Sequence, residues 1–185
     1  MRSKTTIAAL FLVCAVLSRA DGQSMPVDST DQQIERRYDR FKDQTTVRLK
    51  ALLIRQIARP REELSLSVEA TYKGEQPARP QEVRLIFDSV AGRYLYYDKA
   101  EALFIVDGKR IDAGAAGMMN ALPSPNLVKV SLALTLPFDT FVEIAKAKGV
   151  ELKLGPTELR LSEKNLASLR AFASAVGNES KGDQQ

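Results

Sequence analysis

The chain has no histidine and no tryptophan, and its single cysteine, Cys14, lies near the N-terminus. Without histidine, a Ser-His-Asp triad, an imidazole base and a histidine-ligated metal are excluded. Without a second cysteine, internal disulfides and the usual zinc sites are excluded too. We therefore expect no metal site and no cofactor. Only carboxylate, serine, lysine or tyrosine chemistry remains open to the chain.

The sequence motifs of several large enzyme classes are missing as well. The 185 residues contain no Gly-x-Ser-x-Gly, Ser-x-x-Lys, Gly-x-x-x-x-Gly-Lys or Gly-x-Gly-x-x-Gly pattern, and no EF-hand loop. These absences argue against the corresponding hydrolases and nucleotide-binding proteins. They favour a binding domain over an enzyme, although they do not exclude catalysis by carboxylates.

The N-terminal residues 1–20 have the pattern of a secretory signal peptide. Arg2 and Lys4 precede an apolar run from Ile7 to Leu17, and Ser18-Arg19-Ala20 supplies the small residues of a cleavage site. Such a run is too short to span a bilayer, which takes about 20 residues. We therefore predict a secreted or periplasmic protein with no transmembrane segment after signal removal.

Signal removal also changes the charge of the chain. The formal net charge is +4, and residues 1–20 contain three basic and no acidic residues, so the remaining chain carries +1. The basic balance is thus no evidence for nucleic acid as a partner, and we expect none. Beyond the signal we expect a flexible polar lead-in (21–37), one domain (38–176) and a disordered polar tail (177–185). Ile34, Tyr38 and Phe41 have the spacing of a short amphipathic turn docked on that domain.

Most of the domain alternates apolar and polar residues, which is typical of strands with one buried face. Alternation covers 47–53, 64–72, 83–87, 128–136, 150–154 and 159–161, and Arg93–Tyr97 also has strand composition. Helical spacing appears from Phe138 to Ala145 and again after Ser162, a favourable N-cap. Gly149 and Gly177 are placed to end these two helices. The pattern predicts an α+β fold: an antiparallel sheet, arranged as a meander and curled into a half-barrel or a two-layer sandwich, with two C-terminal helices around a β-hairpin.

The segment Ala102–Asp112 carries the strongest local signal in the chain. Asp107-Gly108 between two strand-like runs predicts a two-residue type I′ turn, which needs positive φ at both positions. This turn places Phe104 opposite Ile111, and Leu103 and Ile105 on the other face. Because the first strand is then apolar on both faces, we expect it inside the sheet.

Three stretches together carry a resemblance: Tyr38–Asp43, Asp107–Ile111, and Phe141–Leu169 with Leu154-Gly155-Pro156-Thr157-Glu158 in its middle. In these the chain resembles a group of uncharacterised secreted bacterial proteins. The resemblance covers most of the chain after the signal. It implies export from a bacterium and supplies no activity, ligand or site.

Two regions are candidates for binding an unknown protein or small ligand. The first is the tyrosine group, in which strand alternation would put Tyr94 and Tyr96 on one face as a stacking surface. The second is the segment 113–126, which has no strand pattern and which we interpret as a long loop carrying Met118, Met119 and Leu122. Each region also has a plain structural interpretation, as core and strand surface or as a mobile connector.

A cluster of charges, Asp107, Lys109, Arg110 and Asp112, surrounds the hairpin turn, and we interpret it as a solvated face rather than a catalytic or cation site. The leading functional hypothesis is an exported non-catalytic accessory or interaction domain. One alternative is a carboxylate-based hydrolase acting on envelope or extracellular glycans. The other is a subunit of a surface assembly joined through an exposed strand edge.

Overall fold

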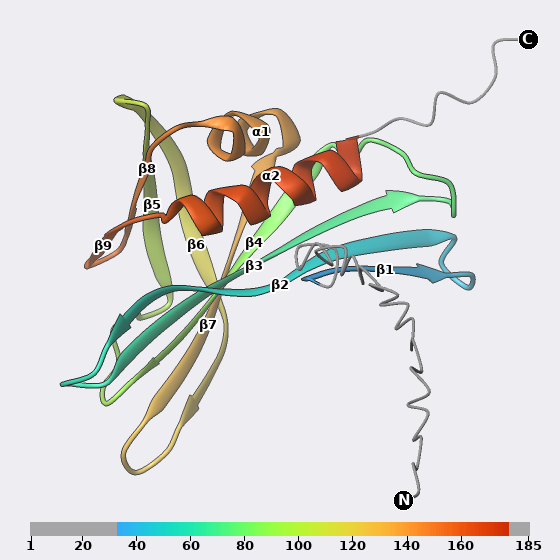
Figure 1. Ribbon diagram of the computed structural model, residues 1–185. Coiled ribbons are helices and arrows are strands. Elements are labelled where there is room, and N and C mark those ends of the chain that lie inside the picture. The colour runs from blue at the N-terminus through green and yellow to red at the C-terminus, as the bar shows by residue number, and fades with distance from the viewer. Residues whose placement is uncertain (1–32, 178–185) are drawn as a thin grey trace, which may run out of the picture.

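The computed structural model describes residues 33–177. The predicted signal peptide, most of the predicted lead-in and the predicted tail after Gly177 lie outside the described residues. Within the described range the chain forms one curved antiparallel sheet and two helices (Figure 1). The strands are β1 Ile34–Asp39, β2 Gln44–Ile57, β3 Glu62–Lys73, β4 Glu82–Ala91, β5 Lys99–Val106, β6 Lys109–Pro123, β7 Val128–Pro137, β8 Val150–Leu154 and β9 Thr157–Arg160. The helices are α1 Phe138–Lys146 and α2 Glu163–Gly177.

The strand order in the sheet is β1-β2-β3-β4-β7-β6-β5-β8-β9, and every pair is antiparallel. The predicted α+β class and half-barrel are confirmed. The order departs from a simple meander at two places: the chain leaves β4, skips two positions and enters β5, and it later leaves β7, passes through α1 and enters β8 beyond β6 and β5. The connection 92–98 spans the gap that β6 and β7 later fill. Sequence alternation records which residues face inward, but it carries no information on which strands are neighbours.

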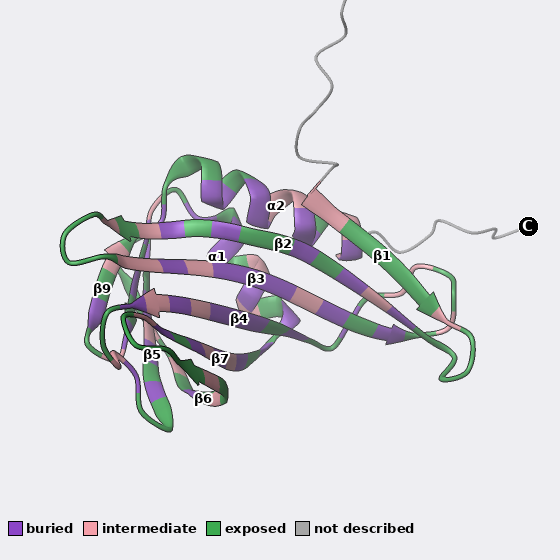
Figure 2. Cartoon of the chain, turned by 90° about the horizontal axis from the view of Figure 1, so that it is seen from below, coloured by how far each residue is buried: buried purple, intermediate pink, exposed green. Residues whose placement is uncertain are grey.

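The concave face of the half-barrel is filled by the two helices. Figure 2 shows the buried and exposed residues alternating along the strands, with α1 and α2 against the sheet. Phe141 of α1 packs edge-on against Phe172 of α2, with ring centroids 5.8 Å apart, and both rings are buried. Burying an aromatic side chain contributes about 1.5–3 kcal/mol. The helices therefore complete the core that the open sheet cannot close alone.

The predicted hairpin is confirmed in detail. Asp107 and Gly108 have φ values of 49° and 87°, as a type I′ turn requires. Phe104 pairs with Ile111, and Leu103 and Ile105 pair with Asp112 and Arg110. The strand β5 lies between β6 and β8, so its position inside the sheet is confirmed as well.

Both predicted helix starts are confirmed, and α2 extends to Gly177 as predicted, but the predicted end of α1 at Gly149 was wrong. Ser162 caps α2: its Oγ accepts a hydrogen bond from the Asn165 amide at 3.2 Å, and Asn165 Oδ1 accepts one from the Ser162 amide at 3.2 Å. The helix α1 ends earlier than expected, with Ala147 in an extended conformation as its C-cap. Gly149 lies beyond the helix, where its amide donates to Asp107 Oδ1 at 2.8 Å.

Two segments differ from the sequence prediction. Residues 34–39 form the edge strand β1 rather than an amphipathic turn: Ile34 packs on the core, whereas Phe41 is almost fully exposed in the β1–β2 turn. The predicted loop 113–126 is wrong for most of its length, because β6 continues to Pro123. Pairing with β5 on one side and β7 on the other imposes the strand on a segment rich in alanine and glycine.

Candidate functional site

The outer face of the sheet at β6, β5, β8 and β9 carries two rows of side chains. Each row runs across the four strands in the order charged, apolar, charged, charged. Strand pairing aligns Arg110, Ile105, Glu151 and Arg160 in one row, and Asp112, Leu103, Lys153 and Glu158 in the next. Each row therefore has one apolar residue, on β5, between charged residues on the neighbouring strands. The charges of the two rows are opposite at every charged position.

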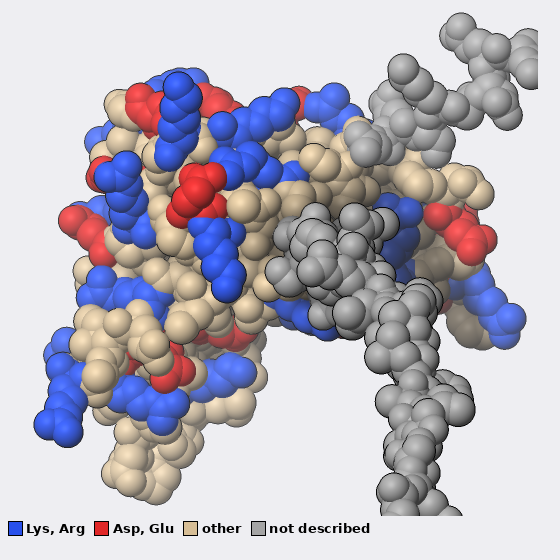
Figure 3. Space-filling view, viewed as in Figure 1, with Lys and Arg blue, Asp and Glu red and all other residues tan. Residues whose placement is uncertain are grey.

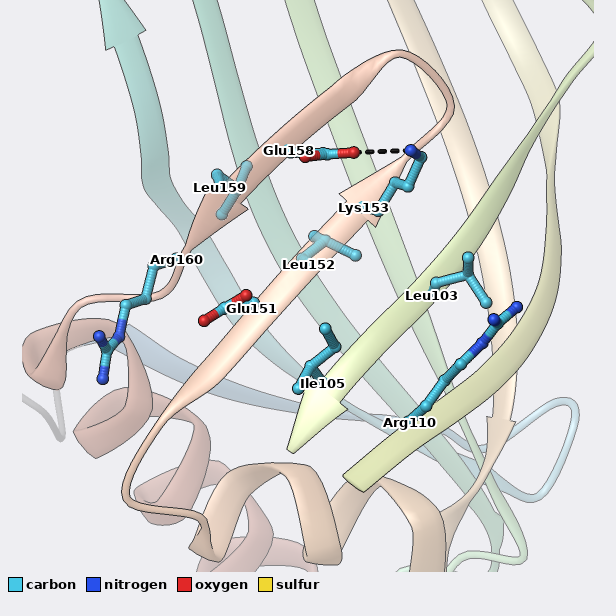
Figure 4. Close-up of a pocket in the computed structure, with 9 residues that line it drawn as sticks. All are labelled: Leu103, Ile105, Arg110, Glu151, Leu152, Lys153, Glu158, Leu159 and Arg160. Atoms are coloured by element: carbon cyan, nitrogen blue, oxygen red, sulfur yellow. Dashed lines mark hydrogen bonds and ion pairs between the residues drawn. The ribbon is translucent and has the colours of Figure 1, made fainter. Parts of the chain in front are cut away.

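A depression of about 450 Å³ lies over these rows. Figure 4 shows Leu103 and Ile105 side by side on β5, with Arg110 of β6 on one side and Glu151 and Lys153 of β8 on the other. Ile105 is 42% exposed, and no second layer covers it among residues 33–177. An apolar centre inside a ring of mixed charge is the arrangement found at protein–protein interfaces.

The charges around the depression are partly satisfied within the rows. Lys153 Nζ lies 2.6 Å from Glu158 Oε1, and this hydrogen bond, with the positive charge of Lys153, lowers the pKa of Glu158. The Arg160 side chain extends toward the turn before β8. The Arg160 Nη2 atom lies 3.1 Å from the position that a Cβ on Gly149 would occupy. One ion pair thus lies within the charged rim of the depression.

The charged cluster around the hairpin turn has structural partners. Asp107 accepts hydrogen bonds from the backbone amides of Lys148 and Gly149, which fixes the turn against the start of β8. Lys109 Nζ pairs with Glu143 Oε1 of α1 at 2.8 Å, and Asp112 Oδ1 accepts from the Gly114 amide. These contacts fit our interpretation for Asp107, Lys109 and Asp112, whereas Arg110 lines the depression.

The structure separates the tyrosines that we expected to share a face. Tyr96 is 2% exposed, and its hydroxyl donates to Thr157 Oγ1 at 2.8 Å. Burial raises the pKa of Tyr96, and the hydrogen bond with Thr157 offsets part of this effect. Tyr94 instead stacks on Tyr97, with ring centroids 5.7 Å apart. The expected pair was wrong because residues 92–98 form an irregular connection without strand alternation.

The remaining candidates all lie on the distal part of β6. Met118 is half-buried against the core, whereas Met119 and Leu122 are exposed by 48% and 56%. None of these side chains lies in the depression on the outer face. Sequence reasoning missed that depression, although it did note the signal that reveals it: β5 is apolar on both faces, and one of those faces has no cover.

The described residues thus form an antiparallel half-barrel closed by two helices, with a mixed-charge depression on its outer face. No family model, no curated protein and no solved structure matches the chain. Neither helix of the described range is long and apolar enough to cross a membrane. Residues 33–177 also contain no group of three or more acidic residues placed to hold a metal ion.

Proposed function

We propose that this protein is an exported, non-catalytic interaction domain that binds a partner protein through the depression on the outer face of β5. The observation that carries the proposal is the uncovered apolar pair Leu103 and Ile105 inside a ring of opposite charges. An exposed apolar patch with a polar rim is typical of a binding surface. The alternating charges would orient the partner and discriminate against others.

The depression offers little support for a hydrolase. A general acid needs a carboxyl group whose pKa is raised toward neutrality. Glu158, one of the two acids lining the depression, has a lowered pKa because it accepts a hydrogen bond from Lys153. The depression is also open, whereas a glycan-cleaving site encloses its substrate between two carboxyl groups.

A photo-crosslinking amino acid at position 105 tests the proposal in the producing cells. Leu53 is the matched control, because it is an apolar residue on β2 that is 51% exposed. We expect one discrete crosslinked protein from position 105 and none from position 53. The crosslink should decline in an Arg110→Glu variant, which reverses one charge of the rim. Equal crosslinking at both positions would refute a specific partner site.

Export is tested separately by the mass of the protein outside the cytoplasm. Cleavage after Ala20 would leave Asp21 as the N-terminal residue. A chain recovered with Met1, or with a lipid on Cys14, would contradict a cleaved signal peptide. This result would leave the binding surface on β5 unaffected.

A further inference from the structure

The β6–β7 hairpin projects from the half-barrel and its tip carries no charge. No charged residue occurs between Asp112 on β6 and Lys129 on β7. Figure 3 shows the result: the projection at the bottom of the view is free of blue and red atoms, whereas charges are spread over the rest of the visible surface. Pairing between β5 and β6 ends at Gly117, so the tip extends beyond its neighbour.

The tip combines exposed apolar side chains with a closed turn. Met119 and Leu122 are among the exposed large apolar residues of the described chain, and Pro123 and Pro125 are exposed beside them. The Ser124 amide and hydroxyl both donate to the Leu127 carbonyl, at 2.7 and 2.8 Å. The turn therefore satisfies part of its own backbone, whereas the exposed polar side chains of Asn120, Ser124 and Asn126 keep the tip at the level of the headgroups.

Aromatic and basic residues flank the β6–β7 hairpin along its length. The connection 92–98 is held against the hairpin, because the Met118 amide donates to the Asp98 carbonyl at 2.7 Å and Gly92 lies next to the Asn126 carbonyl. This connection carries the stacked pair Tyr94 and Tyr97. Two exposed basic residues lie on these segments, Arg93 and Lys129, and a third, Lys99, begins β5; the connection also carries one exposed acid, Asp98.

We propose that the β6–β7 hairpin docks the protein on an anionic membrane surface. Its features match the parts of a lipid interface: uncharged apolar side chains for the acyl boundary, tyrosines for the headgroup level, and basic residues, with Lys129 directly opposite Leu122, for anionic headgroups. An apolar pocket in a partner protein could also bind the exposed apolar side chains. Such a pocket would not require the flanking tyrosines and basic residues.

The depth of docking is limited by the backbone of the tip. Beyond Gly117, β6 has a strand partner on one side only, so its free backbone groups need water or headgroups. The hairpin therefore enters the interface without spanning the bilayer. The site is separate from the depression on β5, so either proposal can fail without the other.

The absence of tryptophan from the chain makes the test specific. A Leu122→Trp variant places a single fluorescent reporter on the tip, and Leu53→Trp places one on β2 as the control. Both proteins are purified as the cell processes them, so that any effect of the N-terminal segment is common to the two. Each is titrated with vesicles of phosphatidylethanolamine and phosphatidylglycerol, and with vesicles of phosphatidylcholine alone.

We expect a blue shift of the tip reporter with the anionic vesicles and little change of the control reporter. In the Leu122→Trp background, Lys129→Gln should weaken the apparent affinity about fivefold, since one basic residue contributes about 1 kcal/mol near an anionic surface. A brominated lipid with its bromine near the headgroup should quench the tip reporter more than one brominated at the chain end. An unshifted tip reporter, or equal shifts at both positions, would overturn the proposal.

Discussion

At the scale of single residues, two glycines on the β5–β6 pair have opposite conformational needs. Gly108 in the turn has φ of +87°, and a Cβ there would meet no atom within 4 Å. A Cβ at Gly117 on β6 would also meet no atom within 4 Å, but the φ of Gly117 lies outside the positive range. Because an added Cβ is not crowded at either position, a comparison of the two isolates the effect of backbone conformation.

We predict that Gly108→Val lowers the free energy of unfolding by about 1–2 kcal/mol, because a β-branched residue is forced into the left-handed region. Gly117→Val is the matched control and should change stability much less. Urea denaturation followed by circular dichroism measures both variants. Equal losses in the two proteins would show that the positive φ of Gly108 does not determine the cost of the substitution.

Tyr96 links the irregular connection 92–98 to the edge strand β9 through its hydroxyl. Tyr96→Phe should cost about 1 kcal/mol at neutral pH, since Thr157 Oγ1 then loses its buried partner. The pH dependence of the free energy of unfolding should change too. A raised folded-state pKa means that the stabilisation is complete below about pH 10 and is lost as the pH rises through the folded pKa.

Melting temperatures of the wild type and of Tyr96→Phe between about pH 9 and 11 test this linkage. The wild type should lose stability more steeply than the variant over this range. Tyr38→Phe provides the control, because the pKa of Tyr38 is also raised, by its hydrogen bond to Asp43, but that phenol is exposed. Parallel pH profiles for the wild type and Tyr96→Phe would show that the buried phenol does not titrate in this range.

At the scale of elements, sequence periodicity identified strands where large apolar residues alternate with polar ones. It failed on β6, where the residues from Ala113 to Gly117 are small and have little preference for a strand. Register shifts against β5 and β7 further disturb the period of two. The depression was partly predictable, because the apolar outer face of β5 was visible in the sequence. Its charged rim was not, since the pairing of β5 with β8 is a long-range contact.

The corrected assignment of β6 changes what a deletion should do. Replacing residues 113–126 by a Gly-Ser bridge removes the strand that joins β7 to β5, and we predict a protein without a cooperative melt. Replacing only residues 120–126 keeps every β5–β6 pair and should lower the melting temperature by only a few degrees. Circular dichroism and gel filtration distinguish these outcomes. A folded protein after the longer replacement would show that β6 is dispensable.

At the scale of the whole molecule, the half-barrel is closed by side chains rather than by strand pairing. The seam runs between β2 and β9, which lie near opposite edges of the sheet. Arg55 Nη1 of β2 donates to the Glu158 carbonyl of β9 at 3.0 Å, and Asn165 Nδ2 of α2 lies 3.4 Å from the Leu53 carbonyl. These contacts join residues more than a hundred positions apart, so no local pattern in the sequence could indicate them.

We predict that a substitution at the seam changes the local stability of β9 without changing the melting temperature of the whole protein. Arg55 Nε is buried and has no hydrogen-bond partner among residues 33–177, so Arg55→Met removes one favourable bond and one unsatisfied donor together. We therefore expect the melting temperature to change little, while amide hydrogen exchange in β9 becomes several-fold faster, because β9 pairs only with β8. Lys50→Met is the control, since Lys50 lies on the same strand and pairs with Glu35 of β1 instead. Unchanged exchange in β9 together with a large loss of global stability would show that Arg55 acts through the core and not through the seam.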